Sequence, residues 1–268
     1  MRASGEPTRQ SDERRERCDC SAFLWESTGP ARLHGFLHHA PSCFERCYSF
    51  DLMPAPGTTE ARERLATGYA LDYMWSETMG RSEGDSKEQP LRLIAALLEQ
   101  EHVPYALIGG VAVQIHTADP RTTLDIDLAV LTYADVPSDA LRRAGFEHTG
   151  RHAHSDNWRA PGPGLITQRT AVQFSAEDVG VADAVRRATT IELGDGVRLR
   201  VASVADLVLL KLTAAEESNR RPSRREHDVA DVLALLEEHP EVQSRELLIR
   251  IQAVRARLSA SLGETIDK

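Results

Sequence analysis

The chain has 268 residues, which is enough for one or two domains with a substantial core. Hydrophobic residues make up 41% and charged residues 27%, as in an ordinary globular protein, and no apolar run reaches the roughly 18 residues that would span a bilayer. The formal net charge of −9 excludes a surface that binds nucleic acid everywhere, although it is compatible with a local basic patch. Because no continuous apolar segment follows the N-terminal arginines, we expect a cytoplasmic protein without a secretion signal.

Residues 1–89 show no sustained periodicity, so we expect a poorly structured leader with at most one short helix, over residues 60–73. An open alternative is that translation begins near Met74 or Met79. All four cysteines lie before residue 50, in a C-x-C and a C-x-x-x-C pair. This is not the usual spacing of a zinc site, so we favour unligated thiols.

From Pro90 onward, local signals agree with one another. The spacing of Leu91, Ile94 and Leu97 predicts an amphipathic helix. The next segments predict a buried strand ending in glycines (PYALIGG), a short helix (VAVQIHTA) and a second strand (TLDIDLAVL). Farther along we expect a helix in SDALRRAG, a loop in HAHSDNWRAPGPG, strands in LITQR and TAVQFSA, a helix in EDVGVADAVRRA and a strand in VRLRVAS.

The C-terminal part predicts three successive amphipathic helices, in SVADLVLLKLTAAEES, SRREHDVADVLALLEEH and SRELLIRIQAVRARLSASL. We therefore expect a mixed α/β (α+β) domain over residues 90–202, followed by a helical part over residues 203–268 that completes the site. The arginines of NRRPSRR, between the first two helices, either form a solvated linker or guide a polyanion such as tRNA.

Two aspartates interrupt the second strand, Asp125 and Asp127. Residues two apart in a strand point to one face, so the two carboxylates project together while Ile126 and Leu128 point into apolar packing. Neighbouring carboxylates raise each other's pKa unless a cation lies between them, and Mg²⁺ is held by one or two carboxylates with phosphates and water. The pair alone is equally compatible with a strand end that reaches solvent.

Gly109 and Gly110 lie where the preceding strand turns into a helix. Without Cβ atoms the backbone can approach a ligand closely, and the N-terminus of a helix offers N–H groups to phosphate. A paired glycine is weak evidence by itself. Followed by D-x-D on the next strand, it predicts a phosphate cradle beside a pair of metal ligands, as phosphoryl or nucleotidyl transfer requires.

With these motifs, residues 90–240 resemble the minimal nucleotidyltransferase superfamily of the polymerase-β-like fold. The paired glycine and RTTLDIDL carry the resemblance to the superfamily. DLVLLKL and RREHDVADVLALL are similar to the AbiEii-type toxin nucleotidyltransferases of type IV toxin–antitoxin systems. The resemblance implies a nucleotidyltransferase-like mixed sheet flanked by helices.

The resemblance also implies roles for single residues. Gly109 and Gly110 would hold the triphosphate of the incoming nucleotide, and Asp125 and Asp127 would bind Mg²⁺. Two residues before the acids would contact phosphate, Arg121 and Thr123.

Three residues of the C-terminal part would complete the site. Lys211 would reach the phosphates or the transferred group, and Asp228 or Asp231 would act as base or orient the substrate. The alternatives are a lysine that snorkels at the border of a helix and aspartates that form surface ion pairs with the neighbouring arginines.

One departure from the superfamily pattern concerns a third carboxylate on a later strand. The inward-pointing residue of TAVQFSAED is Gln173, which cannot ionise. Glu177 and Asp178 are possible substitutes, but they lie at the start of the next helix, where acids are favourable in any case.

The resulting hypothesis is an Mg²⁺-dependent enzyme that moves a nucleoside monophosphate from an NTP to an acceptor hydroxyl. By resemblance it is a toxin that acts on tRNA or protein and has a cognate antitoxin. Two alternatives remain open: a nucleotide-binding or partner-binding module with little catalytic activity, and a nucleotidyltransferase of small molecules such as aminoglycosides.

Overall fold

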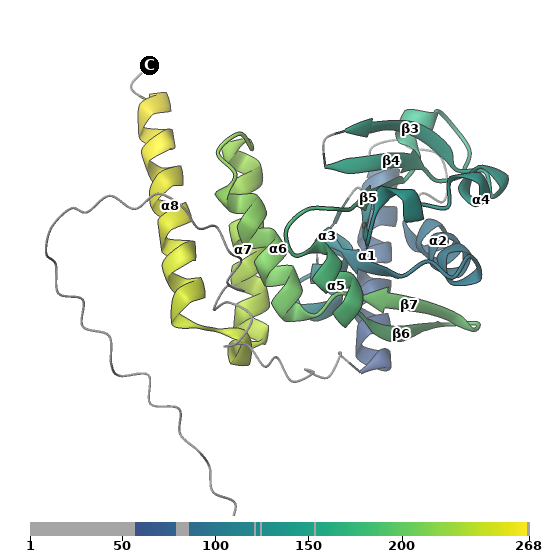
Figure 1. Cartoon of the computed structure of the whole chain (residues 1–268), viewed down its shortest axis with the longest axis horizontal. Helices are drawn as coiled ribbons and strands as arrows, with labels where there is room; N and C mark the ends of the chain where they lie inside the picture. Colours follow the sequence, from purple (N-terminus) through teal and green to yellow (C-terminus); the bar gives the residue numbers. More distant parts are fainter. Residues whose placement is uncertain (1–56, 79–85, 121, 124, 153, 267–268) are drawn as a thin grey trace, which may run out of the picture. The chain divides into compact units, whose positions relative to one another are not determined.

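The computed structural model describes residues 57–78, 86–120, 122–123, 125–152 and 154–266. All of these residues belong to one compact unit, residues 50–268. Figure 1 shows a sheet with helices α6, α7 and α8 gathered beside it. Within the described ranges, no helix is long and apolar enough to cross a membrane.

Across the described residues, seven strands form one mixed sheet in the order β3-β4-β5-β2-β1-β7-β6. The strands are β1 (Tyr105–Ile108), β2 (Asp125–Val130), β3 (Glu147–His152), β4 (Ser155–Arg159), β5 (Ala171–Ser175), β6 (Thr189–Gly194) and β7 (Val197–Val201). Strand β2 pairs antiparallel with β1 and parallel with β5. The strand that carries the two aspartates is therefore the central strand of the sheet.

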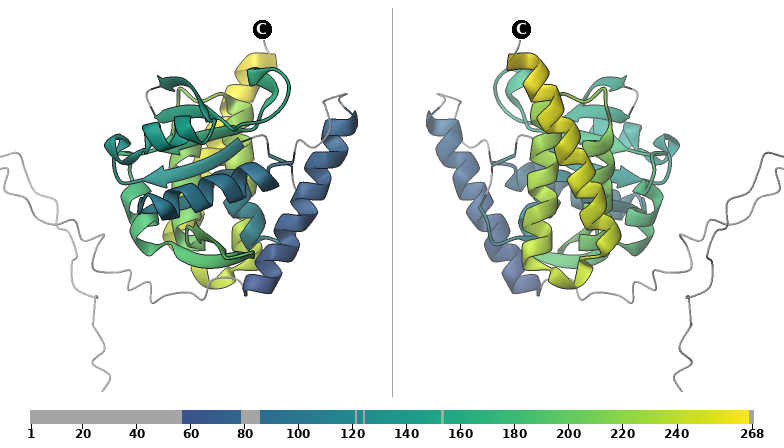
Figure 2. Two further views of the ribbon diagram at one scale, coloured as in Figure 1. Left: turned by 90° about the vertical axis from the view of Figure 1, so that its right-hand side faces the viewer. Right: turned by 90° about the vertical axis from the view of Figure 1, so that its left-hand side faces the viewer.

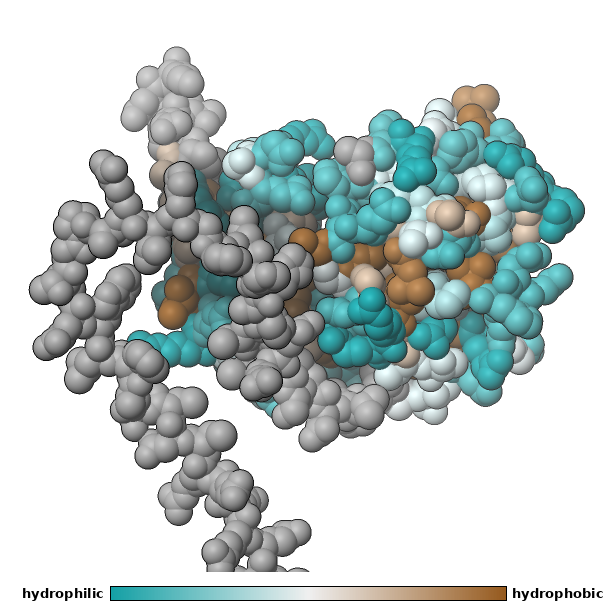
Figure 3. Space-filling view, viewed as in Figure 1, coloured by the Kyte–Doolittle hydropathy of each residue, from teal (hydrophilic) through white to brown (hydrophobic). Residues whose placement is uncertain are grey.

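The helices are α1 (Thr58–Thr78), α2 (Glu88–Gln100), α3 (Gly109–His116), α4 (Ser138–Arg143), α5 (Val181–Arg187), α6 (Val204–Glu216), α7 (Pro222–Glu238) and α8 (Arg245–Ile266). Helix α2 buries Leu91, Ile94 and Leu97, as its spacing predicts. The expected mixed α/β fold, with helices α6 to α8 at the C-terminal end, is confirmed. Figure 3 shows a largely hydrophilic face with apolar residues gathered in a band across its middle.

Two expectations for the edge of the sheet are wrong. The segment LITQR forms no strand, because Ile166–Gln168 is a short 3-10 helix. The segment HAHSDNW contains strand β4, which forms a hairpin with β3. Five of the six residues of β3 are exposed, so this edge strand has no alternation of polar and apolar residues from which it could be recognised.

The largest difference concerns the leader expected over residues 1–89. Helix α1 packs against α3, and Figure 2 shows it running along one side of the unit. Gln114 donates a hydrogen bond to the Arg64 carbonyl at 2.8 Å, and a Cβ on Gly68 would lie 1.7 Å from the Gln114 amide. The short helix expected over residues 60–73 is confirmed by α1, but a poorly structured leader is the wrong description of residues 58–78, because this helix is longer and packed; the cysteines and Met79 lie outside the described residues.

The reason lies in which residues α1 buries. Its buried positions follow helical spacing and are Ala61, Leu65, Gly68, Asp72 and Ser76. Only one of them is a large apolar residue, so the sequence carries almost no hydrophobic periodicity here.

The C-terminal end of α3 is fixed by a buried histidine, His116. Its Nε2 donates to the Ala202 carbonyl at 2.9 Å, and His239, the residue after α7, bonds to the carbonyl of His116 at 2.9 Å. The Nδ1 atom of His116 has no hydrogen-bond partner among the described residues. Burial, with smaller contributions from His239 and Arg64, lowers the pKa of His116 to about 4.

We predict that α1 contributes to the stability of the folded unit. Leu65 is 2% exposed and Met74 is 61% exposed on the same helix. Leu65→Ala should lower the free energy of unfolding by about 2–5 kcal/mol, because it removes buried apolar contacts. Met74→Ala should change it by less than about 0.5 kcal/mol. Urea unfolding of the two variants compares them, and equal effects would contradict the packing of α1.

A second prediction concerns acid stability. Since the folded-state pKa of His116 is depressed to about 4, the unfolded chain binds a proton between pH 6.5 and 4 that the folded chain does not bind. Stability therefore falls as the pH drops through this window, by up to about 3 kcal/mol. His116→Gln keeps an amide donor for Ala202 and should remove this dependence. Parallel pH profiles of unfolding for the two proteins would contradict the prediction.

Candidate active site

The turn between β1 and α3 is built from two glycines that other residues cannot replace. Gly109 has φ +67°, a conformation that L side chains rarely adopt. A Cβ on Gly109 would lie 1.9 Å from Oδ2 of Asp127, and a Cβ on Gly110 would lie 2.9 Å from Oγ1 of Thr123. The glycines therefore allow the acids of β2 and the turn before it to come into contact with the N-terminus of α3.

The two carboxylates lie on one face of β2, while Ile126 and Leu128 are fully buried on the other face, as expected. The carboxylate of Asp125 accepts two hydrogen bonds. Thr123 Oγ1 donates to its Oδ1 at 3.1 Å, and Gln173 Nε2 donates to its Oδ2 at 3.0 Å. Gln173 stands opposite Asp127 in the register of β2 and β5, so an amide occupies the position of the third acid.

The environment of Asp127 disfavours its negative charge. Burial, and then the charge of Asp125, raise the pKa of Asp127 to about 7. Lys211, the backbone N–H of Gly110 and Arg220 act in the opposite direction but do not cancel the shift. The nearby positive charges are therefore too weak to keep the pKa of the Asp127 carboxylate at its ordinary value.

A second group of charges faces the cleft from α6 and α7. Lys211 Nζ lies 2.8 Å from Oδ2 of Asp231 and 3.1 Å from Oδ1 of Asp228, and Arg220 Nε lies 2.9 Å from Oδ2 of Asp228. The two aspartates are 2% and 5% exposed, so they are not the surface ion pairs of the alternative interpretation. Burial alone would lower the pKa of Lys211, but the carboxylates of Asp231 and Asp228 raise it.

One cleft of about 660 Å³ brings these groups together, between the sheet and the C-terminal helices. Its wall includes the glycine turn, Thr123, both acids of β2, Lys211 and both aspartates of α7. Every predicted site residue that the structure describes therefore lines the same cleft. The remaining one, Arg121, lies outside the described residues.

Two contacts in this cleft could not be predicted from the sequence. The pairing of Arg220 with Asp228 was hidden, because Arg220 is one of several arginines in a segment that reads as a linker. His154 and Asp178 also line the cleft, with His154 Nδ1 3.1 Å from Asp178 Oδ1. No sequence spacing connects these two residues, which meet only because β4 pairs with β5.

The residues at the acid pair fit Mg²⁺ better than zinc. No group of three or more His, Cys, Asp or Glu suited to a metal exists within the described part of the chain, which disfavours a closed zinc site there. Mg²⁺ needs only one or two carboxylates when phosphates and water complete its shell. A cation bound between the two carboxylates would offset the burial and the charge of Asp125, which raise the pKa of Asp127.

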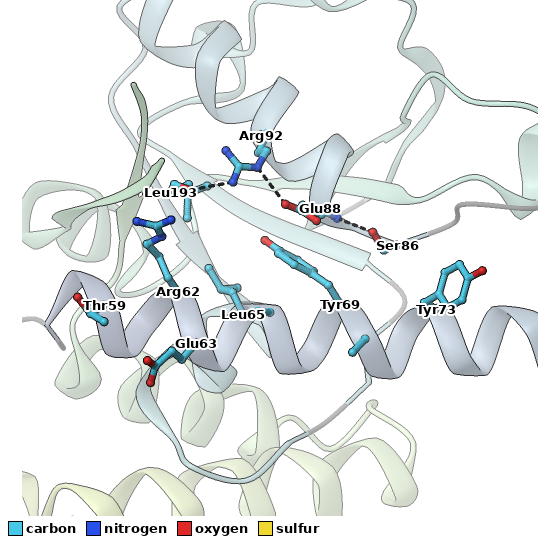
Figure 4. A pocket seen from close by; sticks show the side chains of 12 residues that line it. Thr59, Arg62, Glu63, Leu65, Tyr69, Tyr73, Ser86, Glu88, Arg92 and Leu193 are labelled. Atoms are coloured by element: carbon cyan, nitrogen blue, oxygen red, sulfur yellow. Dashed lines mark hydrogen bonds and ion pairs between the residues drawn. The ribbon is translucent and has the colours of Figure 1, made fainter. Parts of the chain in front are cut away.

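A separate hollow of about 750 Å³ lies between α1 and α2 (Figure 4). Tyr69, Tyr73 and Arg92 are among its lining residues, and burial is the main reason that the pKa of Tyr69 is raised. None of the residues that line the cleft lines this hollow. It is therefore distinct from the candidate active site, and we assign it no role.

A mixed sheet with a strand–Gly–Gly–helix turn packed against a D-x-D strand is the architecture of a nucleotidyltransferase. The profile of the family described as "Nucleotidyl transferase AbiEii toxin, Type IV TA system" matches residues 92–266. The chain belongs to this family and is a nucleotidyltransferase. No curated protein matches it.

Several solved structures show a partial likeness to this chain. An antigenic nucleotidyltransferase-like protein from Paracoccidioides brasiliensis has 20% identity over 66% of this chain and 91% of its own, with a TM-score of 0.44. The antibiotic-resistance factor ANT(2'')-Ia has 14% identity over 69% of this chain and 100% of its own, with a TM-score of 0.44. JHP933 from Helicobacter pylori has 16% identity over 61% of this chain and 70% of its own, with a TM-score of 0.44. Likenesses of this size say nothing about substrates.

We predict that the contact between Gly109 and Asp127 is needed for nucleotide binding. Gly196 is a matched control, because it also has a positive φ (+75°) but nothing within 4 Å of an added Cβ. Substitution of either glycine by Ala should cost about 1–2 kcal/mol of stability through backbone strain. Gly109→Ala should in addition weaken binding of Mg²⁺-NTP by at least about tenfold, or 1.4 kcal/mol, because it displaces Asp127.

Isothermal titration calorimetry with a non-hydrolysable NTP analogue measures this difference without an acceptor. Urea unfolding of both variants provides the stability comparison. Equal nucleotide affinity of Gly109→Ala and Gly196→Ala would contradict the assignment of the turn.

Proposed function

We propose that this nucleotidyltransferase moves a nucleoside monophosphate from an NTP to an acceptor hydroxyl in an Mg²⁺-dependent reaction, in which the acceptor oxygen bonds to the α-phosphate, the bond between the α- and β-phosphates breaks and pyrophosphate leaves. The observation that carries the proposal is the acid pair pressed against the glycine turn, with a raised pKa at Asp127. Because the chain belongs to the AbiEii family, we infer that it is the toxin of a type IV toxin–antitoxin system and that it has a cognate antitoxin. We further infer that it acts in the cytoplasm, with tRNA or protein as the acceptor.

In this proposal the turn binds the triphosphate. Gly109 and Gly110 lie at the start of α3, where the first N–H groups have no partner within the helix and can bind phosphate oxygens. The N–H of Gly110 bonds to the carboxylate of Asp127, so it would change partner when phosphate binds. Asp125 and Asp127 hold Mg²⁺, which when bound neutralises charge on the triphosphate and polarises the α-phosphate. Thr123 and Gln173 keep the carboxylate of Asp125 in place through their hydrogen bonds.

The α6–α7 group supplies charge on the opposite side of the cleft. Lys211 remains protonated between its two carboxylates and contacts the phosphates or the transferred group. Asp228 or Asp231 orients the acceptor hydroxyl or takes its proton. Because Lys211 bonds to both carboxylates, either aspartate can turn to the acceptor while the other still pairs with the lysine.

A second candidate function is a nucleotide-binding module with little catalytic activity. The amide of Gln173 at the position of the third acid favours it. A small-molecule acceptor of the cationic, aminoglycoside type remains an untested alternative, because carboxylates and cations both line the cleft.

Label transfer from radiolabelled NTPs tests the proposal, with bulk tRNA and a protein extract offered as acceptors. Asp125→Ala should lower transfer by at least about 100-fold, or 2.7 kcal/mol of transition-state stabilisation. Asp139→Ala makes the same change at a side chain that is 88% exposed on α4, and it should leave transfer unchanged. Transfer that persists in Asp125→Ala contradicts the metal site. Mg²⁺-NTP binding by the parent without transfer to either acceptor supports the module instead.

A further inference from the structure

A buried ion pair contacts the turn that precedes the acid pair of β2. The ammonium group of Lys87, just before α2, forms an ion pair with the carboxylate of Asp72 on α1. The same ammonium group donates a hydrogen bond to the backbone carbonyl of Thr123. The side chains of Lys87 and Asp72 are only 7% and 8% exposed. A lysine therefore joins α1 to the turn that precedes β2.

Thr123 continues this connection to the acid pair. Its hydroxyl donates to Oδ1 of Asp125 at 3.1 Å, and the same hydroxyl would lie 2.9 Å from a Cβ on Gly110. The side chain is thus confined between the glycine turn and the carboxylate. A cavity of about 260 Å³ is lined by Asp72, Lys87, Thr123 and Asp125 together, next to the main cleft. The four residues form one continuous series of contacts.

Stability alone does not explain a buried Lys–Asp pair at this place. Removing two charges from water carries a desolvation cost that their attraction offsets only in part. Apolar side chains of similar volume are often as stabilising as a buried ion pair, or more so. What an apolar pair cannot supply is a donor that fixes the orientation of the Thr123 carbonyl.

We infer that Asp72 and Lys87 position the carboxylate of Asp125, with Thr123 as the intermediate contact. Asp72 holds the ammonium group, the ammonium group fixes the Thr123 backbone, and the Thr123 hydroxyl holds Asp125 toward the cleft. The inference rests on the proposed metal site. Both charged residues precede the region that matches the family profile, which begins at residue 92. Helix α1 is accordingly a functional part of the active site as well as a packing element.

The experiment compares three changes in the full chain by Mn²⁺ binding, in the presence of a non-hydrolysable NTP analogue. The double variant Asp72→Leu/Lys87→Met replaces the pair by apolar side chains. Lys87→Arg keeps a cation with hydrogen-bond donors. Leu65→Ala loosens the packing of α1 without touching the pair. Electron paramagnetic resonance of free Mn²⁺ gives the dissociation constants without turnover, and circular dichroism confirms folding at the chosen temperature.

The double variant should weaken Mn²⁺ binding by about tenfold or more, the size of effect usual for residues that orient metal ligands. Lys87→Arg should bind Mn²⁺ more tightly than the double variant, and Leu65→Ala should bind like the parent. A merely structural role for the pair predicts instead that Leu65→Ala weakens Mn²⁺ binding as much as the double variant does. If the double variant does not fold, Thr123→Val removes the last contact of the series and should weaken Mn²⁺ binding in the same direction.

Asp125→Ala separates this inference from the proposed function. If Asp125→Ala loses Mn²⁺ binding while the double variant and Thr123→Val both bind like the parent, the positioning role is wrong and the metal site stands. If Asp125→Ala itself binds Mn²⁺ like the parent, the metal site is wrong and the positioning role is wrong with it.

Discussion

The close approach of the Asp127 carboxylate to Gly109 is the contact on which the rest of the site depends. It requires a residue without Cβ and with a positive φ at the end of β1, and it requires β2 to pair antiparallel with β1 so that Asp127 stands opposite Ile108. The same contact buries a carboxylate beside a second one and raises its pKa to about 7. Geometry and electrostatics together create a place that a cation would stabilise.

Charges around this contact are arranged in two supporting groups. On one side, Lys211 and Arg220 pair with the aspartates of α7, and their positive charges partly oppose the rise in the pKa of Asp127. On the other side, Lys87 and Asp72 meet behind Thr123. Lys211 and the aspartates belong to α6 and α7, and Arg220 lies between these helices, whereas Asp72 belongs to α1 and Lys87 lies just before α2. In the proposed function, a site on β1 and β2 would therefore depend on the packing of segments that precede and follow these strands in the sequence, including residues 58–78, which precede the family match.

The sequence predicted the central strands well, because each signal there has one physical cause. Buried strands are apolar runs, and Asp125, Asp127 and the paired glycine stand out against them. These candidate residues line one cleft. The packing of α1 was not predicted, because a buried residue such as Gly68 gives no apolar signal, and β3 was missed because it is an exposed strand. The Lys87–Asp72 pair had no local signal, because a lysine near the start of a helix is ordinarily a surface residue.

The decisive measurement is a crystal structure with Mg²⁺ and a non-hydrolysable NTP analogue. We expect a metal about 2.0–2.1 Å from oxygens of both Asp125 and Asp127. We also expect phosphate oxygens that accept hydrogen bonds from the backbone at the glycine turn. Nucleotide bound in the hollow between α1 and α2, with no metal at the two aspartates, would overturn the proposed site.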